Sequence, residues 1–143
     1  TDKCEIYAEY SNLKNIHINK NDSTSLIDEF PILSIAAACG KGKMTMRGLG
    51  ELRFKESDRF AAISEGLKKC GVKVNTYSDD MEIVGTKKII GDTIIYSNND
   101  HRIAMSFNVL NLVAEKPILV RGNASIITSF PNFFTTLKSL RYE

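Results

Sequence analysis

The chain has 143 residues, of which 43% are hydrophobic and 25% are charged, with 19 Lys and Arg residues against 17 Asp and Glu residues. These proportions are ordinary for a globular domain and exclude a disordered tail, a collagen-like repeat and a disulfide scaffold. A chain of this length buries roughly 70% of the surface that its unfolded form exposes, so it needs no metal or disulfide for stability. The formal charge of +2 excludes neither small anions nor weak nucleic-acid contact.

The three cysteines, Cys4, Cys39 and Cys70, are widely spaced and include no C-x-x-C pair. This pattern is typical of free thiols in a reducing compartment and argues against a zinc site, so we expect a cytoplasmic protein. The longest apolar stretch, residues 32–39, is too short to cross a bilayer, and the first residues do not resemble a signal peptide. The sequence does not begin with Met, and we expect it to be part of a longer protein.

The first part of the chain predicts short strands and one buried helix. Residues 5–10 and 16–18 are predicted as strands, and the polar residues 19–25 as a loop. The apolar segment that follows predicts a helix opened by Pro31 and ended by Gly40.

The middle of the chain predicts a strand over 44–47, a loop over 48–55 and a helix over 57–70. The apolar residues of that helix recur on one face: Phe60, Ile63, Leu67 and Cys70. A hairpin then pairs residues 72–77 with residues 81–84.

A second round follows the hairpin. Its predicted elements are a strand over 93–96, a helix over 101–115, a strand over 117–121 and a last helix from residue 130 or 131 to residue 140. The alternation predicts an α/β or α+β fold with a repeated sheet-and-helix unit, rather than an all-parallel Rossmann sheet. Neither G-x-G-x-x-G nor a Walker A sequence is present, so a nucleotide cradle has no support.

Two predicted helices begin with an arginine close to an acidic residue, Arg59 after Asp58 and Arg102 after Asp100. A helix start carries partial positive charge, so a cation there is locally unfavourable. One interpretation is that each guanidinium reaches solvent or pairs with the neighbouring aspartate. The other is that the helix start and the guanidinium together form a site for phosphate or carboxylate, and its occurrence twice favours this second interpretation.

Three further residues also allow two interpretations. Lys55 and Glu56 are either solvated surface residues or functional ones, since they lie just before a predicted anion-binding helix start. In the second case Lys55 contacts the phosphate or carboxylate and Glu56 transfers a proton. Asp28 either caps the helix that Pro31 opens or, in its apolar surroundings, has a raised pKa and acts as a general base.

Four segments then resemble one family in order and spacing. They are Asp28–Pro31 (DEFP), Glu51–Arg59 (ELRFKESDR), Asn99–Met105 (NDHRIAM) and Ser129–Phe134 (SFPNFF). The chain resembles the EPSP synthases, the 3-phosphoshikimate 1-carboxyvinyltransferases of the enolpyruvate transferase family. The second and third segments are the most specific, and together the four span nearly the whole chain.

The resemblance implies a fold and a place in a larger enzyme. The family has two domains of repeated βαβαββ units, with helices inside and sheets outside, an inside-out α/β barrel. Residues 1–143 are then expected to be a single domain, the C-terminal part of a two-domain enzyme. The N-terminal domain is expected in some ~280–300 preceding residues.

The resemblance also implies an activity, the transfer of the enolpyruvyl group from phosphoenolpyruvate to the 5-hydroxyl of shikimate 3-phosphate in aromatic amino acid biosynthesis. It implies no metal or organic cofactor, and no nucleic-acid or membrane partner. The implied catalytic residues are Asp28, the proton acceptor near the 5-hydroxyl, Lys55, which contacts the same substrate, and Glu56, which exchanges a proton with the methylene carbon. The implied phosphoenolpyruvate contacts are Arg59, Arg102 and His101.

One position departs from the family. Where a lysine is usual before the S/T-F-P sequence, this chain has Thr128, which can donate a hydrogen bond but brings no charge. A lost charge-assisted contact is worth roughly 1.5–3 kcal/mol, so weaker phosphoenolpyruvate binding is expected. The alternative hypothesis is a non-catalytic domain that binds anions without performing a reaction, and the fragment alone is expected to be inactive.

Overall fold

The computed structural model of the protein describes residue 5 and residues 7–140. The chain forms two successive sheet-and-helix units, called here the first and second rounds. The first round contains β1 (His17–Ile18), α1 (Lys20–Ser23), α2 (Phe30–Cys39), β2 (Lys43–Met46), a 3₁₀ helix (Gly50–Phe54), α3 (Arg59–Lys69), β3 (Lys73–Tyr77) and β4 (Asp80–Val84). The second round contains β5 (Thr93–Tyr96), α4 (His101–Leu110), β6 (Ile118–Arg121), α5 (Ala124–Ser129) and α6 (Phe133–Ser139). The mixed α/β fold expected from the alternation is confirmed.

The strands form two separate sheets. The first has the order β1-β2-β4-β3, with β1 parallel to β2 and the β3–β4 hairpin antiparallel, so the first round is a βαβαββ unit. The second sheet pairs β5 with β6 in parallel. The second round thus repeats the parallel strand–helix–strand arrangement of the first.

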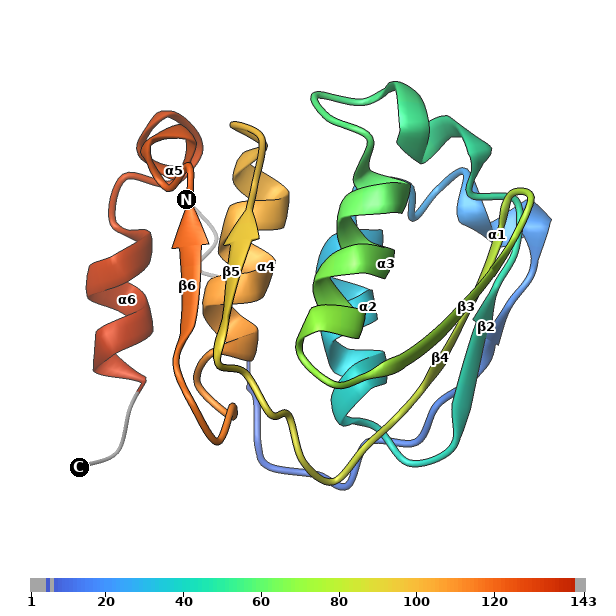
Figure 1. Ribbon diagram of the computed structural model, residues 1–143, viewed down its shortest axis with the longest axis horizontal. Helices are drawn as coiled ribbons and strands as arrows, with labels where there is room; N and C mark the ends of the chain where they lie inside the picture. The colour runs from blue at the N-terminus through green and yellow to red at the C-terminus, as the bar shows by residue number, and fades with distance from the viewer. Residues whose placement is uncertain (1–4, 6, 141–143) are drawn as a thin grey trace.

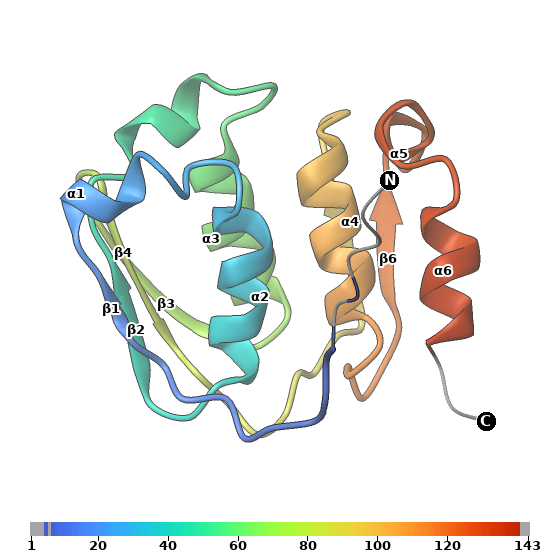
Figure 2. The same ribbon diagram turned by 180° about the vertical axis from the view of Figure 1, so that it is seen from behind.

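The helices α2 and α3 lie between the first sheet and the second round (Figures 1 and 2). Figure 1 shows them on one face of the four-stranded sheet, with α4 on their other side and α6 farthest away. The buried hydrophobic residues form one cluster that draws on both rounds. The predicted inner face of α3 is confirmed, because Phe60, Ile63, Leu67 and Cys70 are all buried.

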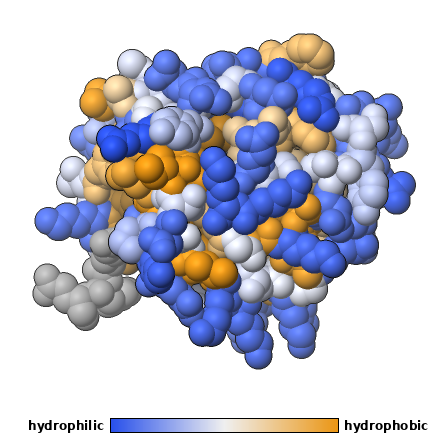
Figure 3. Space-filling model, in the orientation of Figure 1, coloured by the Kyte–Doolittle hydropathy of each residue, from blue (hydrophilic) through white to orange (hydrophobic). Residues whose placement is uncertain are grey.

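The outer surface carries both hydrophilic and hydrophobic side chains. Hydrophilic side chains dominate the face in Figure 3, with separate hydrophobic patches, one of them over β5 and β6. The exposed hydrophobic residues of these two strands are Ile94, Tyr96 and Leu119.

Two predictions at the start of the chain are wrong. No strand forms at residue 5 or residues 7–10, where Tyr7 and Tyr10 are almost fully exposed and no neighbouring strand offers hydrogen bonds. The loop expected at 19–25 contains the short helix α1, in which the buried Ser23 donates through its hydroxyl to the carbonyl oxygens of Asn19 and Arg47.

Two later boundaries also differ. The helix expected over 101–115 ends at Leu110, because the side chain of Asn111 accepts from the backbone of Ile118 and the chain turns towards β6. The last helix, expected from residue 130 or 131 to residue 140, forms as α6 but begins only at Phe133, after Pro131, and an additional helix that was not expected, α5, precedes it.

Candidate functional site

The Arg59 side chain is the centre of a cluster of charged residues. It is fully buried at the first residue of α3 and donates to three carboxylates from three parts of the chain. Nε lies 2.7 Å from Oδ2 of Asp100, Nη1 lies 2.9 Å from Oδ1 of Asp28, and Nη2 lies 2.6 Å from Oε2 of Glu56. The guanidinium therefore joins the segment before α2, the segment before α3 and the start of α4.

Asp28 does not cap α2. Glu29 occupies the position before the helix and makes no side-chain cap, while the Asp28 carboxylate accepts from Arg59 and lies 3.7 Å from Nζ of Lys55. Burial acts to raise the pKa of Asp28, but the hydrogen bond from Arg59 and the charges of Lys55, Arg102 and Arg59 outweigh it and lower the pKa. The raised pKa expected from the apolar sequence context is therefore wrong, and Asp28 is ionised at neutral pH.

Lys55 and Glu56 lie on the accessible side of the cluster. Nζ of Lys55 is 2.9 Å from Oε1 of Glu51, and that hydrogen bond raises the pKa of Lys55, so its cation is retained. The Glu56 side chain is half-exposed even though it binds Arg59. Solvent or a ligand can therefore reach both side chains.

Asp100 and Arg102 fix the start of α4. Oδ1 of Asp100 accepts from the backbone N–H groups of Arg102 and Ile103, which caps the helix. Nη1 of Arg102 donates to the carbonyl oxygen of Asp28 and to Oε1 of Glu29, at 2.8 Å and 3.2 Å. Its side chain keeps a third of its surface exposed, whereas Arg59 keeps none.

The two interpretations of the helix-start arginines can now be compared. Arg59 pairs with Asp100 rather than with Asp58, and Arg102 pairs with Glu29, so neither forms the local pair first considered. Both guanidiniums contact Asp28. The helix-start N–H groups, however, are capped by aspartate side chains.

The other predicted residues are more peripheral. His101 is half-buried at the first residue of α4, next to Arg102. Thr128 is exposed on α5, and its hydroxyl donates to the carbonyl oxygen of Ser125 at 2.8 Å. The aromatic rings that follow pack on one another edge to face, as expected for a packing role, and they belong to Phe130, Phe133 and Phe134.

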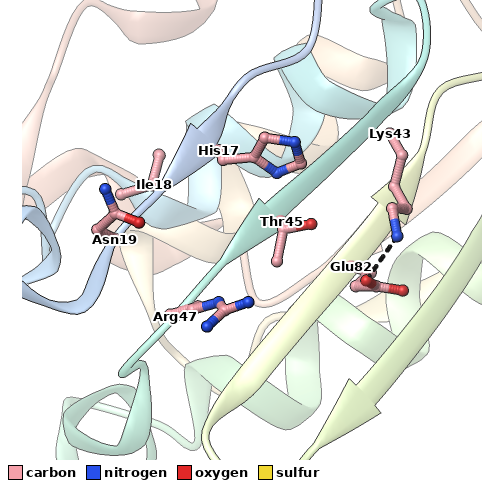
Figure 4. Close-up of a pocket in the computed structure, with 7 residues that line it drawn as sticks. All are labelled: His17, Ile18, Asn19, Lys43, Thr45, Arg47 and Glu82. Atoms are coloured by element: carbon pink, nitrogen blue, oxygen red, sulfur yellow. Dashed lines mark hydrogen bonds and ion pairs between the residues drawn. The ribbon is translucent and has the colours of Figure 1, made fainter.

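Two hollows differ in their relation to this cluster. One, of about 280 Å³, is lined at its charged side by Asp28, Glu29 and Arg102. The rest of its lining is mainly apolar and comes from α2, from α4 and from residues 130 and 133. A larger one, of about 470 Å³, lies on the outer face of the first sheet, between His17, Lys43, Thr45, Arg47 and Glu82 (Figure 4). It contains none of the predicted site residues, whereas the smaller hollow contains Asp28 and Arg102.

The sequence prediction missed two members of the cluster. Asp100 was considered as a local partner of Arg102, yet it is fully buried and is the partner of Arg59. Glu51 was expected in a loop, yet it pairs with Lys55 one turn later. The acidic residue before His101 was visible in the sequence, but nothing in the sequence indicated which cation it would face.

Chemically, the cluster combines an ionised carboxylate with two accessible cations. Asp28 can accept a proton, and Lys55 and Arg102 can attract an anion beside it. Within the described residues, no group of three or more His, Cys, Asp and Glu side chains is arranged to hold a metal ion. No helix in this part of the chain is long and apolar enough to span a membrane.

Comparison with known proteins assigns the family. The family model for EPSP synthase (3-phosphoshikimate 1-carboxyvinyltransferase) matches residues 2–137. Proteins of that name are similar to the chain in Paramagnetospirillum magneticum, at 43% identity over 95% of this chain and 31% of the relative, and in Legionella pneumophila, at 42% identity over 97% and 32%. An EPSP synthase structure from Acinetobacter baumannii superimposes with a TM-score of 0.83 at 38% identity, over 90% of this chain and 30% of that one. The chain spans about a third of the length of these relatives, and it belongs to the EPSP synthase family.

Proposed function

We propose that the chain is the C-terminal portion of an enzyme that transfers the enolpyruvyl group of phosphoenolpyruvate to the 5-hydroxyl of shikimate 3-phosphate. The observation that carries this proposal is the contact of Arg59 with Asp28, Glu56 and Asp100, which brings together three of the four family segments. Both substrates are expected to bind between this portion and the N-terminal domain of the same enzyme.

The proposed reaction needs one base and one acid. Asp28 removes the proton of the 5-hydroxyl while that oxygen bonds to C2 of phosphoenolpyruvate, and Glu56 protonates C3. In the second step the bond from C2 to the phosphate oxygen breaks, Glu56 takes a proton from C3, and the departing phosphate receives the proton that Asp28 held, so both residues return to their starting forms. The lowered pKa of Asp28 keeps it in the form that accepts a proton.

The cations have different proposed parts because their exposures differ. Lys55 and Arg102 keep accessible surface and make the first contact with the anionic substrates. Arg59 has no exposed surface and donates to carboxylates with Nε, Nη1 and Nη2. It can therefore reach phosphoenolpyruvate only when the substrate displaces Glu56 or Asp28 from its Nη atoms. His101, which precedes Arg102 at the start of α4, is a further proposed contact of phosphoenolpyruvate.

The test uses a composite enzyme, the P. magneticum relative with its matching segment replaced by this chain. We expect phosphate release that requires both shikimate 3-phosphate and phosphoenolpyruvate. Asp28→Asn and Glu56→Gln should each lower kcat by about 10²-fold or more, since each removes a proton-transfer group. A matched control is Lys43→Gln, which breaks the ion pair with Glu82 on the outer sheet face and should leave turnover unchanged.

Two results would count against the proposal. A folded composite enzyme that binds both substrates without releasing phosphate would favour the non-catalytic, anion-binding alternative. Full activity of Asp28→Asn and Glu56→Gln would remove these two residues from the reaction. The 143-residue chain alone is expected to show no turnover.

A further inference from the structure

Asp100 makes more contacts than a helix cap requires. Its carboxylate is fully buried, and both of its oxygens have more than one partner. Oδ1 accepts from the backbone of Arg102 and Ile103, at 2.9 Å and 3.3 Å, and more weakly from Nη2 of Arg59, at 3.5 Å. Oδ2 accepts from Nε of Arg59 at 2.7 Å and from the hydroxyl of Ser57 at 3.1 Å.

The neighbouring helix shows what capping alone looks like. At the start of α3, Asp58 accepts from the backbone of Ala61 at 2.9 Å with its side chain nearly half exposed, and its other oxygen lies 3.8 Å from Nη1 of Arg53, beyond hydrogen-bond distance. Capping therefore requires neither burial nor a hydrogen bond from a guanidinium. The second oxygen of Asp100 has a separate role, which is to hold the Nε edge of Arg59.

Holding Nε determines where the other edge of the guanidinium points. The group is planar and rigid, so once Nε is fixed, Nη1 and Nη2 are directed at Asp28 and Glu56. The same carboxylate fixes the backbone of Arg102, whose side chain contacts the Asp28 carbonyl. Asp100 thus sets the position of two cations relative to the two carboxylates.

We propose that Asp100 is a positioning residue for the enolpyruvyl transfer, which orients Arg59 and, through it, Asp28 and Glu56. This inference rests on the proposed function and adds a residue to it. Asp100 does not touch substrate; it acts through Arg59 and through the start of α4.

Asp100→Asn separates the two roles of the side chain. Asparagine is as good a helix cap as aspartate, so its amide oxygen retains the contacts with the α4 backbone. Its NH₂ group then faces Nε of Arg59, and two donors cannot form a hydrogen bond. The matched control is Asp58→Asn, the same substitution at the cap of α3, where no guanidinium hydrogen bond is lost.

In the composite enzyme, Asp100→Asn should lower kcat/KM for phosphoenolpyruvate by about 10–100-fold, as misplaced reacting groups do. Asp58→Asn should stay within about two-fold, since the cap is kept. The acidic limb of the pH profile should also move to lower pH in Asp100→Asn. The Arg59 charge, no longer balanced by Asp100, then adds to the charges of Lys55 and Arg102 that lower the pKa of Asp28.

An NMR measurement on the 143-residue chain supplies a readout without turnover. The Nε–H of Arg59 should exchange slowly in the parent chain and in Asp58→Asn, and rapidly in Asp100→Asn. If Asp100→Asn does not fold, Ser57→Ala removes the other contact of Oδ2 and should lower kcat/KM by a smaller factor.

The outcomes separate the two proposals. Loss of kcat/KM in a folded Asp100→Asn enzyme, with the shifted pH limb and faster exchange, supports the positioning role. Kinetics and exchange equal to those of Asp58→Asn overturn it while leaving the proposed function intact. An inactive parent enzyme overturns the proposed function, and the positioning role with it.

Discussion

Replacing Arg59 by methionine tests how much of the fold depends on its buried charge. The contacts with Asp28 and Glu56 lie at half-exposed carboxylates, where each pair is worth about 0–1 kcal/mol. The contact with Asp100 is different, because both side chains are fully buried. Removing one partner of such a pair leaves an uncompensated buried charge and costs about 3–5 kcal/mol.

Asp100 retains three donors after the substitution, namely the hydroxyl of Ser57 and the backbone N–H groups of Arg102 and Ile103. These donors partly satisfy the carboxylate, so we expect Arg59→Met to lower the free energy of unfolding by about 3 kcal/mol, at the low end of that range. Urea unfolding of the 143-residue chain measures the change as a shift of the midpoint at constant slope.

Two further variants control this measurement. Arg102→Met removes a partly exposed guanidinium paired with Glu29 and should cost about 1 kcal/mol or less. Adding Asp100→Asn to Arg59→Met should cost less than the sum of the single changes, because the unpaired charge is removed. A loss below about 1 kcal/mol for Arg59→Met, or strict additivity in the double variant, would refute the dominance of the buried pair.

Three other predictions concern acid stability, backbone packing and substrate affinity. The pKa of Asp28 is lowered from the ordinary 3.8 in the folded state, so its stabilising effect is present above about pH 4 and is lost at lower pH. Asp28→Asn should therefore flatten the acid end of a plot of unfolding midpoint against pH, and an unchanged plot would contradict this. Gly85→Ala places a Cβ against the carbonyl oxygen of Gly40 and should cost about 3 kcal/mol in thermal or urea unfolding. Gly42→Ala, which has open space but a φ of +91°, should cost only about 1 kcal/mol, and equal costs would argue against the steric explanation. In the composite enzyme, Thr128→Lys restores a cation on the exposed side of α5 and should lower the KM for phosphoenolpyruvate by about ten-fold or more; an unchanged KM would place this position outside the site.

Much of the fold could be predicted because local patterns and tertiary packing agree there. The buried face of α3, the β3–β4 hairpin and the parallel strands β5 and β6 all follow from periodicity and turn residues. The predicted strand at residues 5–10 failed because a strand needs a partner, which alternation in one sequence does not supply. The last helix was predicted to begin at residue 130 or 131 but begins after Pro131, whereas Pro31 lies in the first turn of α2, and only the surrounding backbone distinguishes these cases.

Most members of the cluster around Arg59 could be predicted from the sequence, but the contacts between them could not. Asp28, Lys55, Glu56 and the arginines of α3 and α4 do gather, as the motifs predicted. The pKa of Asp28 was predicted to be raised but is lowered. Its apolar neighbours in the sequence indicate burial, which raises the pKa, whereas the cations that lower it come from distant segments of the chain. The partnership of Arg59 with Asp100, 41 residues apart, depends on how two helices pack.

The same partnership also affects how the chain comes apart. Arg59 begins α3 in the first round, and Asp100 precedes α4 in the second round. Separating the two rounds would therefore break this ion pair and leave each charge without its partner. Partial unfolding along that boundary carries an electrostatic penalty in addition to the loss of apolar contact. Denaturation is consequently expected as a single cooperative transition, and a chain cleaved between Val84 and Thr93 should yield two pieces that are each less stable than the whole.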